Sequence, residues 1–405
     1  MLENKTVILG VTGGIAAYKA VELLRLLVKG GATVHVVMTK GATEFVAPLT
    51  FQTLSGNPVH LDLFNLISEQ EIGHISLADR ADLFVIAPAT ANLIAKIAHG
   101  IADDLLTTTV MATTAPVLLA PAMNVNMYEN PFYRENEAKL RKHGYLFVDP
   151  VVGLLACGWD AKGKMQEPAI IMEEAVKALT DQDLQGVTLL VTAGPTREEL
   201  DPVRFISNHS SGKMGYAIAL AAWRRGARVV LVSGPSPLAP PYGVDFRGVE
   251  SAQQMHEAVL QCSTECDVIV KAAAVADYRP LQRLDQKLKK SSDEMSIELT
   301  RNPDILAELG QRKQQGQFLV GFAAETANVA ENAVGKLAAK NLDMIVANDV
   351  SAPGAGFNLD TNKVSIIYRD GRNEELPLLT KDAVAEAILD RVVRERDRLT
   401  PTGSA

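Results

Sequence analysis

Residues 187–223 read VTLLVTAGPTREELDPVRFISNHSSGKMGYAIALAAW, and this stretch decides the fold of the second half of the chain. The apolar run at 187–191 predicts a strand, and the alanine-rich pattern from Gly215 to Trp223 predicts a helix. A strand that leads through a polar loop into a helix gathers backbone N–H groups at the positive end of the helix dipole. We therefore expect a phosphate or carboxylate pocket here, with added side-chain donors from Asn208, Ser210, Ser211 and Lys213.

The loop departs from the usual P-loop. That motif needs Gly, four residues and then Gly-Lys-Ser/Thr, whereas Ser207 stands at the first Gly position and Met214 follows Lys213. An ordinary turn capped by serine and asparagine is the alternative interpretation. The length of the loop and its density of polar groups favour the anion pocket.

Composition excludes several classes of protein. With 405 residues, 47% hydrophobic and 22% charged, the chain is typical of a globular protein of two or three domains. The net charge of -8 argues against nucleic-acid binding, and the basic cluster Lys287, Lys289 and Lys290 is too short for a nucleic-acid surface. A small anionic ligand suits this cluster better, although a solvated surface run is the alternative.

The three cysteines predict a reducing, cytoplasmic location. Cys157, Cys262 and Cys266 form an odd count without the spacing of a disulfide framework. Cys262 and Cys266 have no second Cys or His pair, so we expect structural residues rather than metal ligands. No run of 18 apolar residues occurs and the first apolar run is followed at once by glycines, so neither a membrane span nor a signal peptide is expected.

The first half begins with a β-α-β pattern. A strand is predicted at 7–11, a helix at 15–28 and a second strand at 33–38, with the Gly13-Gly14 turn after the first strand. The glycines lack the Gly-x-Gly-x-x-Gly spacing, and Thr39-Lys40 stands where a dinucleotide site has an acid, so a mononucleotide phosphate is the better prediction. Later strands at 83–86 and 117–120 lead into polar loops, where open parallel sheets bind ligands.

Two doubly wound, mainly parallel-sheet, Rossmann-like α/β domains in tandem are therefore expected. The polar stretch at 181–186 is the predicted linker between a domain at 1–180 and a domain at 187–398, and 399–405 is a predicted disordered tail. After the opening stretch, the second half alternates predicted strands at 228–232, 268–271, 318–322 and 344–346 with predicted helices at 252–261, 303–309, 330–340 and 381–398.

Three residues of the first half have reactive side chains. His74 precedes the strand at 83–86, in a loop or at a helix start, and Asn124 follows the strand at 117–120. A lone histidine is usually structural, and an asparagine in a loop is usually a turn residue. Cys157 lies among glycines and lysines, a setting that lowers a thiol pKa. Each signal is weak alone.

The motifs together resemble known families. GVTGGIAAYK, GHISL, PATANL, PAMN and ACG…GKM resemble the flavin-dependent cysteine decarboxylases over residues 5–175. TAGPTRE, DPVRFISNHSSGKMG, AAAVADYR, KLKK, NPDI, GFAAET, KNLD and AND resemble phosphopantothenate–cysteine ligase from Gly186 to about Arg396. In this order, the two sets resemble the bacterial bifunctional coenzyme A biosynthesis proteins.

For the first half, the resemblance implies FMN as cofactor. FMN would oxidise the cysteinyl thiol of the substrate, which then loses CO2 and is reduced again. His74 would be the base, Asn124 would hold the departing carboxylate and Cys157 would return a proton. The family commonly has Arg where this chain has Lys164, which lacks the planar fork for bidentate contact. The residues implied around FMN are Gly13, Gly14, Ile15, Thr39, Pro88, Ala89, Thr90 and Asn92.

For the second half, the resemblance implies that CTP activates 4'-phosphopantothenate as an acyl-cytidylate, which the amine of L-cysteine attacks. Lys287 would neutralise the triphosphate, and Asn208 would hold the acyl carboxylate or its cytidylate. Arg204 and Ala274 would bind the substrate, with contact across a dimer interface as one option for Arg204. The positions implied to bind CTP are Lys271, Ala272, Ala273, Asp277, Lys287, Asn302, Pro303, Asp304, Ile305, Phe322, Lys336 and Lys340.

The resemblance also implies Mg2+, with its ligands left open, and a homo-oligomer of flavin-domain trimers and ligase-domain dimers, with a dodecamer as the combined form. Other functions share parts of the pattern. Regulatory flavoproteins share the first fold, and a chain without a cysteine at position 157 would favour them. Flavin prenyltransferases lack the set His74, Asn124 and Cys157. Decarboxylases of peptide C-terminal cysteines would make the ligase half redundant.

We predict that FMN copurifies with residues 1–180 alone, because the phosphate turn and the 88–92 loop lie inside this half. The measurement is the visible absorbance spectrum of the purified fragment. A folded but colourless fragment that added FMN cannot reconstitute would contradict the prediction.

Overall fold

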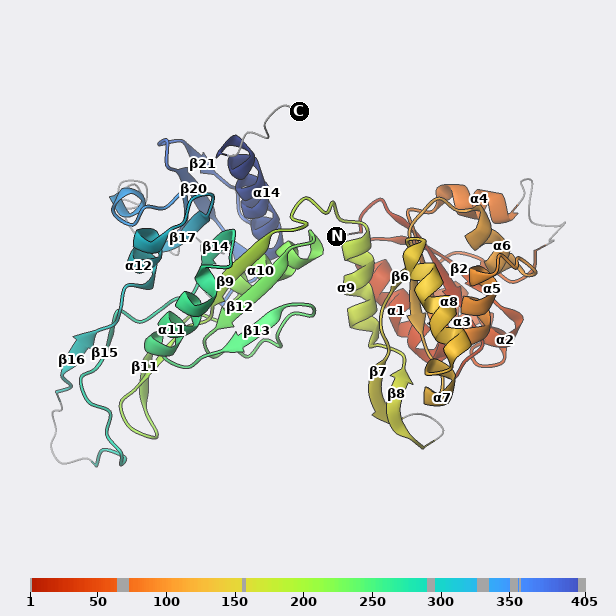
Figure 1. The fold of residues 1–405 in the computed structure, drawn as a ribbon, viewed down its shortest axis with the longest axis horizontal. Helices are drawn as coiled ribbons and strands as arrows, with labels where there is room; N and C mark the ends of the chain where they lie inside the picture. The colour runs from red at the N-terminus through yellow and green to blue at the C-terminus, as the bar shows by residue number, and fades with distance from the viewer. Residues whose placement is uncertain are drawn as a thin grey trace. The chain divides into compact units, whose positions relative to one another are not determined.

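The computed structural model describes residues 2–63, 73–154, 158–289, 296–325, 335–349, 356 and 358–399. The chain divides into two compact units, Met1–Asp181 and Gln182–Ala405. Each unit has a sheet of its own with helices on both faces (Figure 1). The predicted fold class, two doubly wound α/β units with mainly parallel sheets, is confirmed.

The sheet of the first unit has six parallel strands in the order β3-β2-β1-β4-β5-β6. Leu9 and Ile8, neighbours on β1, point into different cores, as the period of a strand requires. The strands are β1 (Thr6–Val11), β2 (Thr33–Met38), β3 (Val59–His60), β4 (Leu83–Ala89), β5 (Val117–Pro121) and β6 (Leu146–Phe147).

Helices cover both faces of this sheet. One core lies under α1 (Ala17–Lys29), α3 (Pro48–Ser55) and α9 (Pro168–Ala178). The other core lies under α4 (Gly73–Arg80), α5 (Ala91–Ala98), α6 (Leu105–Ala112) and α8 (Pro131–Lys142). Three shorter features border the ends of the sheet: α2 (Lys40–Thr43), α7 (Val125–Tyr128) and the hairpin of β7 (Val151–Leu154) and β8 (Asp160–Lys164).

The second unit has an eight-stranded sheet in the order β13-β12-β9-β14-β17-β18-β20-β21. The first six strands are parallel, and β20 and β21 extend the sheet in antiparallel fashion. The bounds are β9 (Thr188–Ala193), β12 (Arg228–Ser233), β13 (Asp245–Gly248), β14 (Val268–Lys271), β17 (Phe318–Glu325), β18 (Met344–Asp349), β20 (Val364–Tyr368) and β21 (Asn373–Glu375).

Helices cover both faces of this sheet in the described part of the chain; besides those bounded below, residues 335–339 are helical and bury Leu337. α10 (Lys213–Arg224) and α14 (Lys381–Leu399) share one core, and α11 (Ala252–Ser263) and α12 (Ile305–Arg312) share the other. Three small two-stranded ladders complete the unit: β10 (Arg197–Glu199) with β11 (Phe205–Ser207), β15 (Tyr278–Pro280) with β16 (Leu299–Arg301), and β19 (Thr361–Asn362) with β22 (Leu379–Thr380).

Several sequence predictions differ from the structure in detail. The helix predicted from Gly215 begins two residues earlier, and the last helix runs one residue further, to Leu399. The predicted helix at 330–340 lies partly outside the described residues, as does the predicted tail. Cys262 and Cys266 are buried free thiols, as expected for structural residues.

Two properties of the described ranges bear on ligands and location. No group of three or more His, Cys, Asp or Glu side chains in them is arranged to hold a metal ion. Nor does any helix there combine the length and the apolar character that crossing a bilayer requires.

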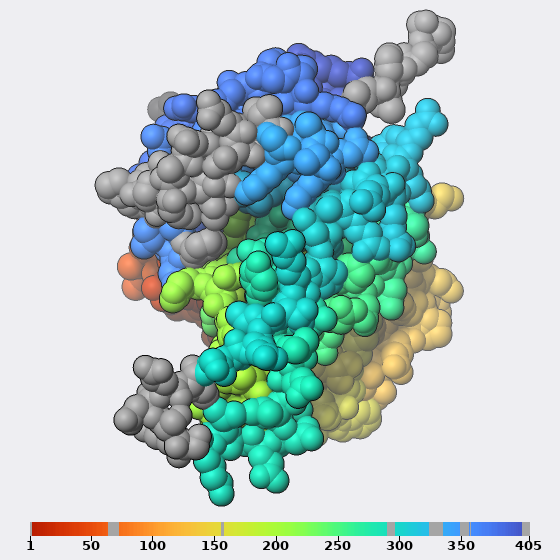
Figure 2. Space-filling view, turned by 90° about the vertical axis from the view of Figure 1, so that its left-hand side faces the viewer, coloured from red at the N-terminus to blue at the C-terminus, as the bar shows by residue number. Residues whose placement is uncertain are grey.

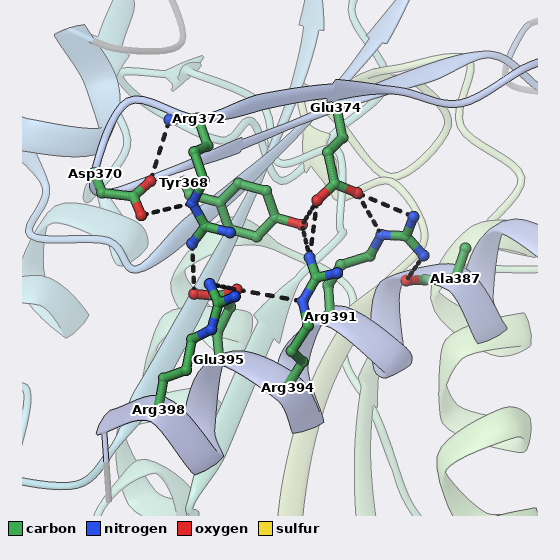
Figure 3. Close-up of polar contacts among 9 residues, drawn as sticks. All are labelled: Tyr368, Asp370, Arg372, Glu374, Ala387, Arg391, Arg394, Glu395 and Arg398. Carbon is green, nitrogen blue, oxygen red and sulfur yellow. Dashed lines mark hydrogen bonds and ion pairs between the residues drawn. The ribbon is translucent and has the colours of Figure 1, made fainter.

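A network of charges fastens the antiparallel edge to α14 (Figure 3). Glu374 on β21 accepts hydrogen bonds from Arg391 (3.0 Å) and Arg394 (2.8 Å) on α14 and from the Tyr368 hydroxyl (2.9 Å). A second carboxylate lies within 3.4 Å of three guanidinium groups: Glu395, with Arg372, Arg394 and Arg398. Shared charges of this kind hold an edge strand that has a neighbour on one side only.

We predict that Glu374→Gln lowers the free energy of unfolding by about 1 kcal/mol, because two arginines lose a shared counter-charge. Burial alone raises the pKa of Glu374, but hydrogen bonds from Arg394, Tyr368 and Arg391 outweigh burial and lower it. A carboxylate with a lowered folded pKa stabilises the fold above its unfolded pKa, and this stabilisation is lost as the pH falls through the folded pKa. The difference from wild type should therefore shrink below about pH 4.

The measurement is urea unfolding followed by circular dichroism at several pH values. Glu375→Gln, at the exposed neighbouring position, is the control and should have almost no effect. Equal losses in the two variants would contradict the assigned role of Glu374.

Candidate functional site

In the first unit, two loops meet at the carboxyl ends of β1 and β4. Thr12 directly follows β1, and its hydroxyl donates to the carbonyl of Pro88 (2.6 Å) and accepts from the backbone N–H of Thr90 (3.2 Å). The hydroxyl of Thr90 in turn caps α5 by accepting from the N–H of Leu93 (3.4 Å). One buried threonine therefore holds the Gly13-Gly14 turn and the 88–92 loop together.

The turn before α1 presents free donors. The N–H groups of Ile15 and Ala16 have no acceptor among the described residues, and the Ile15 side chain is 59% exposed. A Cβ on Gly13 would lie 2.8 Å from the backbone of Gly41, so only glycine fits this turn. Exposed N–H groups ahead of a helix suit a phosphate.

The residues predicted around FMN gather at this edge of the sheet. Pro88 and Ala89 end β4, and the Ala89 carbonyl accepts from the N–H of Ala122 (3.2 Å) at the end of β5. Thr39 precedes α2 and donates its N–H to Val11 (3.0 Å), while Asn92 is exposed in the first turn of α5.

Asn124 lies beside the β7–β8 hairpin. Its Oδ1 accepts from the N–H of Asn126 (2.8 Å) and so caps α7. The N–H of Met123 donates to the carbonyl of Gly163 (3.0 Å), and a Cβ on Gly163 would lie 2.3 Å from the Met123 carbonyl oxygen. The hairpin is therefore in backbone contact with the loop that carries Asn124. Cys157 lies outside the described residues.

His74 lies in the first turn of α4, half-buried, and its Nδ1 is buried without a partner among the described residues. Lys164 ends β8, with its Nζ 3.9 Å from Glu167, which also pairs with the buried Lys19 at 2.9 Å. The Lys164 ammonium therefore shares its counter-ion with a second lysine.

In the second unit, a cleft of about 700 Å³ opens at the carboxyl ends of the parallel strands. Figure 2 shows the side of this unit on which the yellow-green, teal and blue segments of the chain meet. Most residues predicted for the ligase line this cleft: Asn208, Lys271, Ala272, Ala273, Ala274, Asp277, Asn302, Pro303, Asp304, Ile305, Phe322, Lys336 and Lys340.

The first turn of α10 forms one wall of the cleft. Gly212 caps the helix in a left-handed conformation (φ 82°), and the N–H groups of Lys213, Met214 and Gly215 have no acceptor among the described residues. A Cβ on Gly215 would lie 2.6 Å from that of Ala193, so the helix packs directly on the end of β9. The donors that the sequence predicted are therefore displayed into the cleft.

Side-chain hydrogen bonds fix the backbone around 272–277. Asn208 Nδ2 donates to the carbonyl of Ala274 (2.8 Å), and Asn302 Nδ2 donates to that of Ala276 (2.8 Å). The hydroxyl of Thr192 accepts from the N–H of Ala273 (3.1 Å), and the buried Thr196 hydroxyl accepts from that of Ala276 (3.0 Å). These bonds give the floor of the cleft a defined shape.

Positive charge dominates the cleft. Burial lowers the pKa of Lys271 to about 8, and the nearby charge of Lys340 adds to the effect. Lys340 pairs with Asp304 at 2.8 Å. Among the described residues, two acidic side chains, Asp277 and Asp304, and six cationic side chains line the cleft; the cations are Lys213, Lys271, Arg301, Lys336, Lys340 and Lys381. An excess of four positive charges suits a polyanion.

Lys287 and Arg204 lie outside this lining. Arg204 donates to Asp201 (2.9 and 2.6 Å) and to the carbonyl of Leu288 (2.8 Å), and the Leu288 N–H donates back to Asp201 (3.1 Å). Burial raises the pKa of Asp201, but the hydrogen bonds from Leu288, Arg204 and Val203 outweigh it and lower the pKa well below its usual value. In this chain Arg204 therefore anchors the segment that carries Lys287.

The polar residues of the lining that were not predicted include Asn348, Asn362 and Lys381. Asn348 and Asn362 are 8% and 2% exposed, and the Oδ1 of each has no partner among the described residues. A polar residue in the buried run at 344–349 was a signal for Asn348. Nothing in the local sequence separates Lys381 from an exposed helix start.

Comparison with known proteins settles the family. Residues 1–180 match the model described as Flavoprotein, and residues 184–395 match the DNA/pantothenate metabolism flavoprotein C-terminal domain. Over 396 residues the chain is 52% identical to the Coenzyme A biosynthesis bifunctional protein CoaBC of Bacillus subtilis (strain 168), with 97% of both chains covered. The protein of that name from Escherichia coli (strain K12) is 46% identical over 400 residues, with 98% of both chains covered.

The chain belongs to the family of bifunctional coenzyme A biosynthesis proteins. The resemblance indicated by the sequence motifs is thus confirmed, and the first unit is a flavoprotein domain. Among solved structures, the C-terminal domain of a Coenzyme A biosynthesis bifunctional protein CoaBC is 50% identical, covers 54% of this chain and all of its own, and has a TM-score of 0.47. A PPC decarboxylase mutant complexed with pantothenoylaminoethenethiol is 33% identical, covers 42% of this chain and 96% of its own, and has a TM-score of 0.38.

We predict that Gly163→Ala separates the β7–β8 hairpin from the loop at 123–124 of this family member. The new Cβ would overlap the Met123 carbonyl oxygen, and the φ of 142° is one that alanine rarely adopts. The hydrogen bond from Met123 to Gly163 should break, so the Met123 amide should exchange with solvent at least tenfold faster.

Gly144→Ala is the matched control, because its φ is also positive (86°) but no atom lies within 4 Å of its new Cβ. Hydrogen exchange measured by mass spectrometry compares the two variants. Unchanged exchange at Met123 in Gly163→Ala would contradict the contact.

Proposed function

We propose that the second unit joins 4'-phosphopantothenate to L-cysteine with CTP, and that the first unit decarboxylates the product with FMN to give 4'-phosphopantetheine. The observation that carries the proposal is the cleft of the second unit, where an excess of cationic side chains surrounds the free N–H groups of α10. Such a cleft suits a nucleoside triphosphate beside a second phosphate ester.

A carboxylate must be activated before an amine can displace its oxygen. A carboxylate oxygen attacks the α-phosphorus of CTP and displaces pyrophosphate, and the acyl-cytidylate so formed releases CMP when the cysteine amine attacks its acyl carbon. The backbone around Ala272 to Ala274 and the Phe322 region provide donors and acceptors for the cytosine edge. A purine would leave those groups unpaired, which favours CTP over ATP. In this proposal Asn208 orients the acyl carboxylate, which is supported by the hydrogen bond of its amide group to the Ala274 carbonyl on the floor of the cleft.

Lys287 neutralises the triphosphate in this proposal. Arg204 and Asp201 both hydrogen-bond to the backbone of Leu288, the residue next to Lys287. The backbone that carries Lys287 is therefore fixed, although the lysine lies outside the described lining of the cleft. Mg2+ would accompany the triphosphate, and among the described residues Asp277 and Asp304 are the acidic side chains that line the cleft.

In the first unit, the turn at Gly13 to Ile15 would hold the phosphate of FMN, and the 88–92 loop would contact its flavin. The free N–H groups of Ile15 and Ala16 and the buried, unpartnered Nδ1 of His74 fit a bound polar ligand. FMN, when bound, supplies the two-electron oxidation and reduction on either side of CO2 loss.

The chain's own residues then perform three tasks on the substrate. His74 accepts a proton from the substrate, and Asn124 holds the carboxylate that departs as CO2. Cys157 donates a proton to the product. We also propose a homo-oligomer, because the first unit exposes large apolar side chains, including Leu49 and Phe132. Flavin-domain trimers and ligase-domain dimers would combine into the dodecamer.

We predict that Lys287→Gln reduces cysteine-independent pyrophosphate release about a hundredfold, because one preorganised donor to the developing negative charge is removed. The assay contains CTP and 4'-phosphopantothenate without cysteine, and reports acyl-cytidylate formation alone. Lys289→Gln, two residues away, is the control for general charge loss.

Decarboxylation should be unaffected in both variants, since both changes lie in the other unit. Undiminished pyrophosphate release in Lys287→Gln would overturn the assigned role, and equal turnover with ATP would overturn the assignment of CTP.

A further inference from the structure

One end of the cleft lies between the first residues of α10 and α14. Lys213 Nζ donates to the carbonyl of Asn358 (3.0 Å) and to Asp360 Oδ1 (2.6 Å). Lys381 Nζ donates to the carbonyls of Gly356 (3.1 Å) and Leu359 (2.5 Å), and its backbone N–H donates to that of Asp360 (2.9 Å). Both helix starts therefore hold the segment at 358–362 in place.

This segment presents Asn362 to the cleft. Asn362 is 2% exposed and lies in β19, paired with Leu379 of β22. Its Nδ2 approaches only the sulfur of Met214, at 3.7 Å, and its Oδ1 has no partner among the described residues. A buried amide without a strong partner is costly, so a bound molecule that supplies one is stabilised there.

The surroundings of Asn362 are cationic. Lys213 and Lys381 line the same end of the cleft, and Asp360 is the acidic side chain bound to Lys213. The free N–H groups of Lys213, Met214 and Gly215 add the positive end of the α10 dipole. The Oδ1 of Asn362 can accept a hydrogen bond from a hydroxyl group, and the positive charges beside it attract a phosphate. A ligand that carries a hydroxyl group next to a phosphate matches both features.

We propose that this end of the cleft is a subsite for a hydroxyl-bearing phosphate ester, with Asn362 accepting a hydrogen bond from the hydroxyl. Lys213 and the first turn of α10 contact the phosphate oxygens, and Lys381 is a positioning residue that holds the wall carrying Asn362. The proposal rests on the ligase function proposed above and deepens it. CTP, through its ribose, and 4'-phosphopantothenate, through its pantoyl group, both have this chemistry.

The test uses full-length Asn362→Ala and measures pyrophosphate release while each substrate is varied at saturation of the other. Loss of one hydrogen bond to a buried amide should raise the KM of the occupant about tenfold, with kcat changed less than twofold. The KM of the other substrate should stay within twofold, so the affected substrate identifies the occupant.

Asn362→Asp keeps the shape of the side chain and places a negative charge beside the phosphate, so it should weaken the same substrate further. Lys363→Gln, at the exposed neighbouring position, is the control and should leave both KM values unchanged. A thermal melt of each variant shows that it is folded. Unchanged KM values for both substrates in folded Asn362→Ala or Asn362→Asp would overturn the subsite.

Measuring the binding of each compound directly tests the subsite independently of the proposed reaction. Calorimetry with CTP alone and with 4'-phosphopantothenate alone, on wild type and Asn362→Ala, measures the subsite even when no pyrophosphate is released. Absence of release by wild type would overturn the ligase function, whereas equal affinities of the two proteins for both compounds would overturn the subsite.

Discussion

The contact between the first turn of α10 and the end of β9 is the constraint on which the second unit depends. Because Gly215 has no Cβ, the helix axis can approach Ala193 closely, and three backbone N–H groups open into the cleft. The 272–277 backbone lies across from this turn, and the segment at 358–362 is fastened to its first residue.

In both units a threonine fixes the spacing of two loops at the carboxyl edge of the sheet. In each, a threonine at the end of the first strand binds the backbone of the loop after the neighbouring strand. Thr12 does so with Thr90, and Thr192 does so with Ala273. A hydroxyl suits this position because it can donate and accept at once, so two loops on separate strands acquire one fixed spacing. A ligand site at the carboxyl ends of parallel strands requires that the spacing of its loops is already fixed in the protein without ligand.

Sequence predicted the parallel core well, because buried strands are short apolar runs bounded by turns. The strands at 33–38 and 268–271 have the predicted bounds. The antiparallel β20 and β21 were missed, since β21 is three residues long with charged and polar residues only. It is held by Glu374 and two arginines of a helix that follows it in the chain, a long-range contact that local patterns do not encode.

The candidate site likewise contains residues that the sequence predicted and residues that it did not. The loop at 88–92 was found because it directly follows a strand, so its position follows from topology, whereas the stretch at 272–277 was assigned from the resemblance. Asn362 and Lys381 were missed because they reach the cleft through a short ladder and a helix start far along the chain. Arg204 was assigned to a substrate from resemblance alone, and its hydrogen bonds to Asp201 and the Leu288 carbonyl had no signal in the sequence.

Because α14 stabilises both the edge of the sheet and a wall of the cleft, it also affects the order in which the chain folds during synthesis. Its arginines secure the sheet edge and its first residue secures the cleft wall, so the cleft lacks a wall until this helix has emerged from the ribosome. The first unit has its own sheet and cores and is complete much earlier in synthesis, since domains generally fold as units from the N-terminus. A flavin can therefore bind to a nascent chain in which the cleft of the second unit has not yet formed.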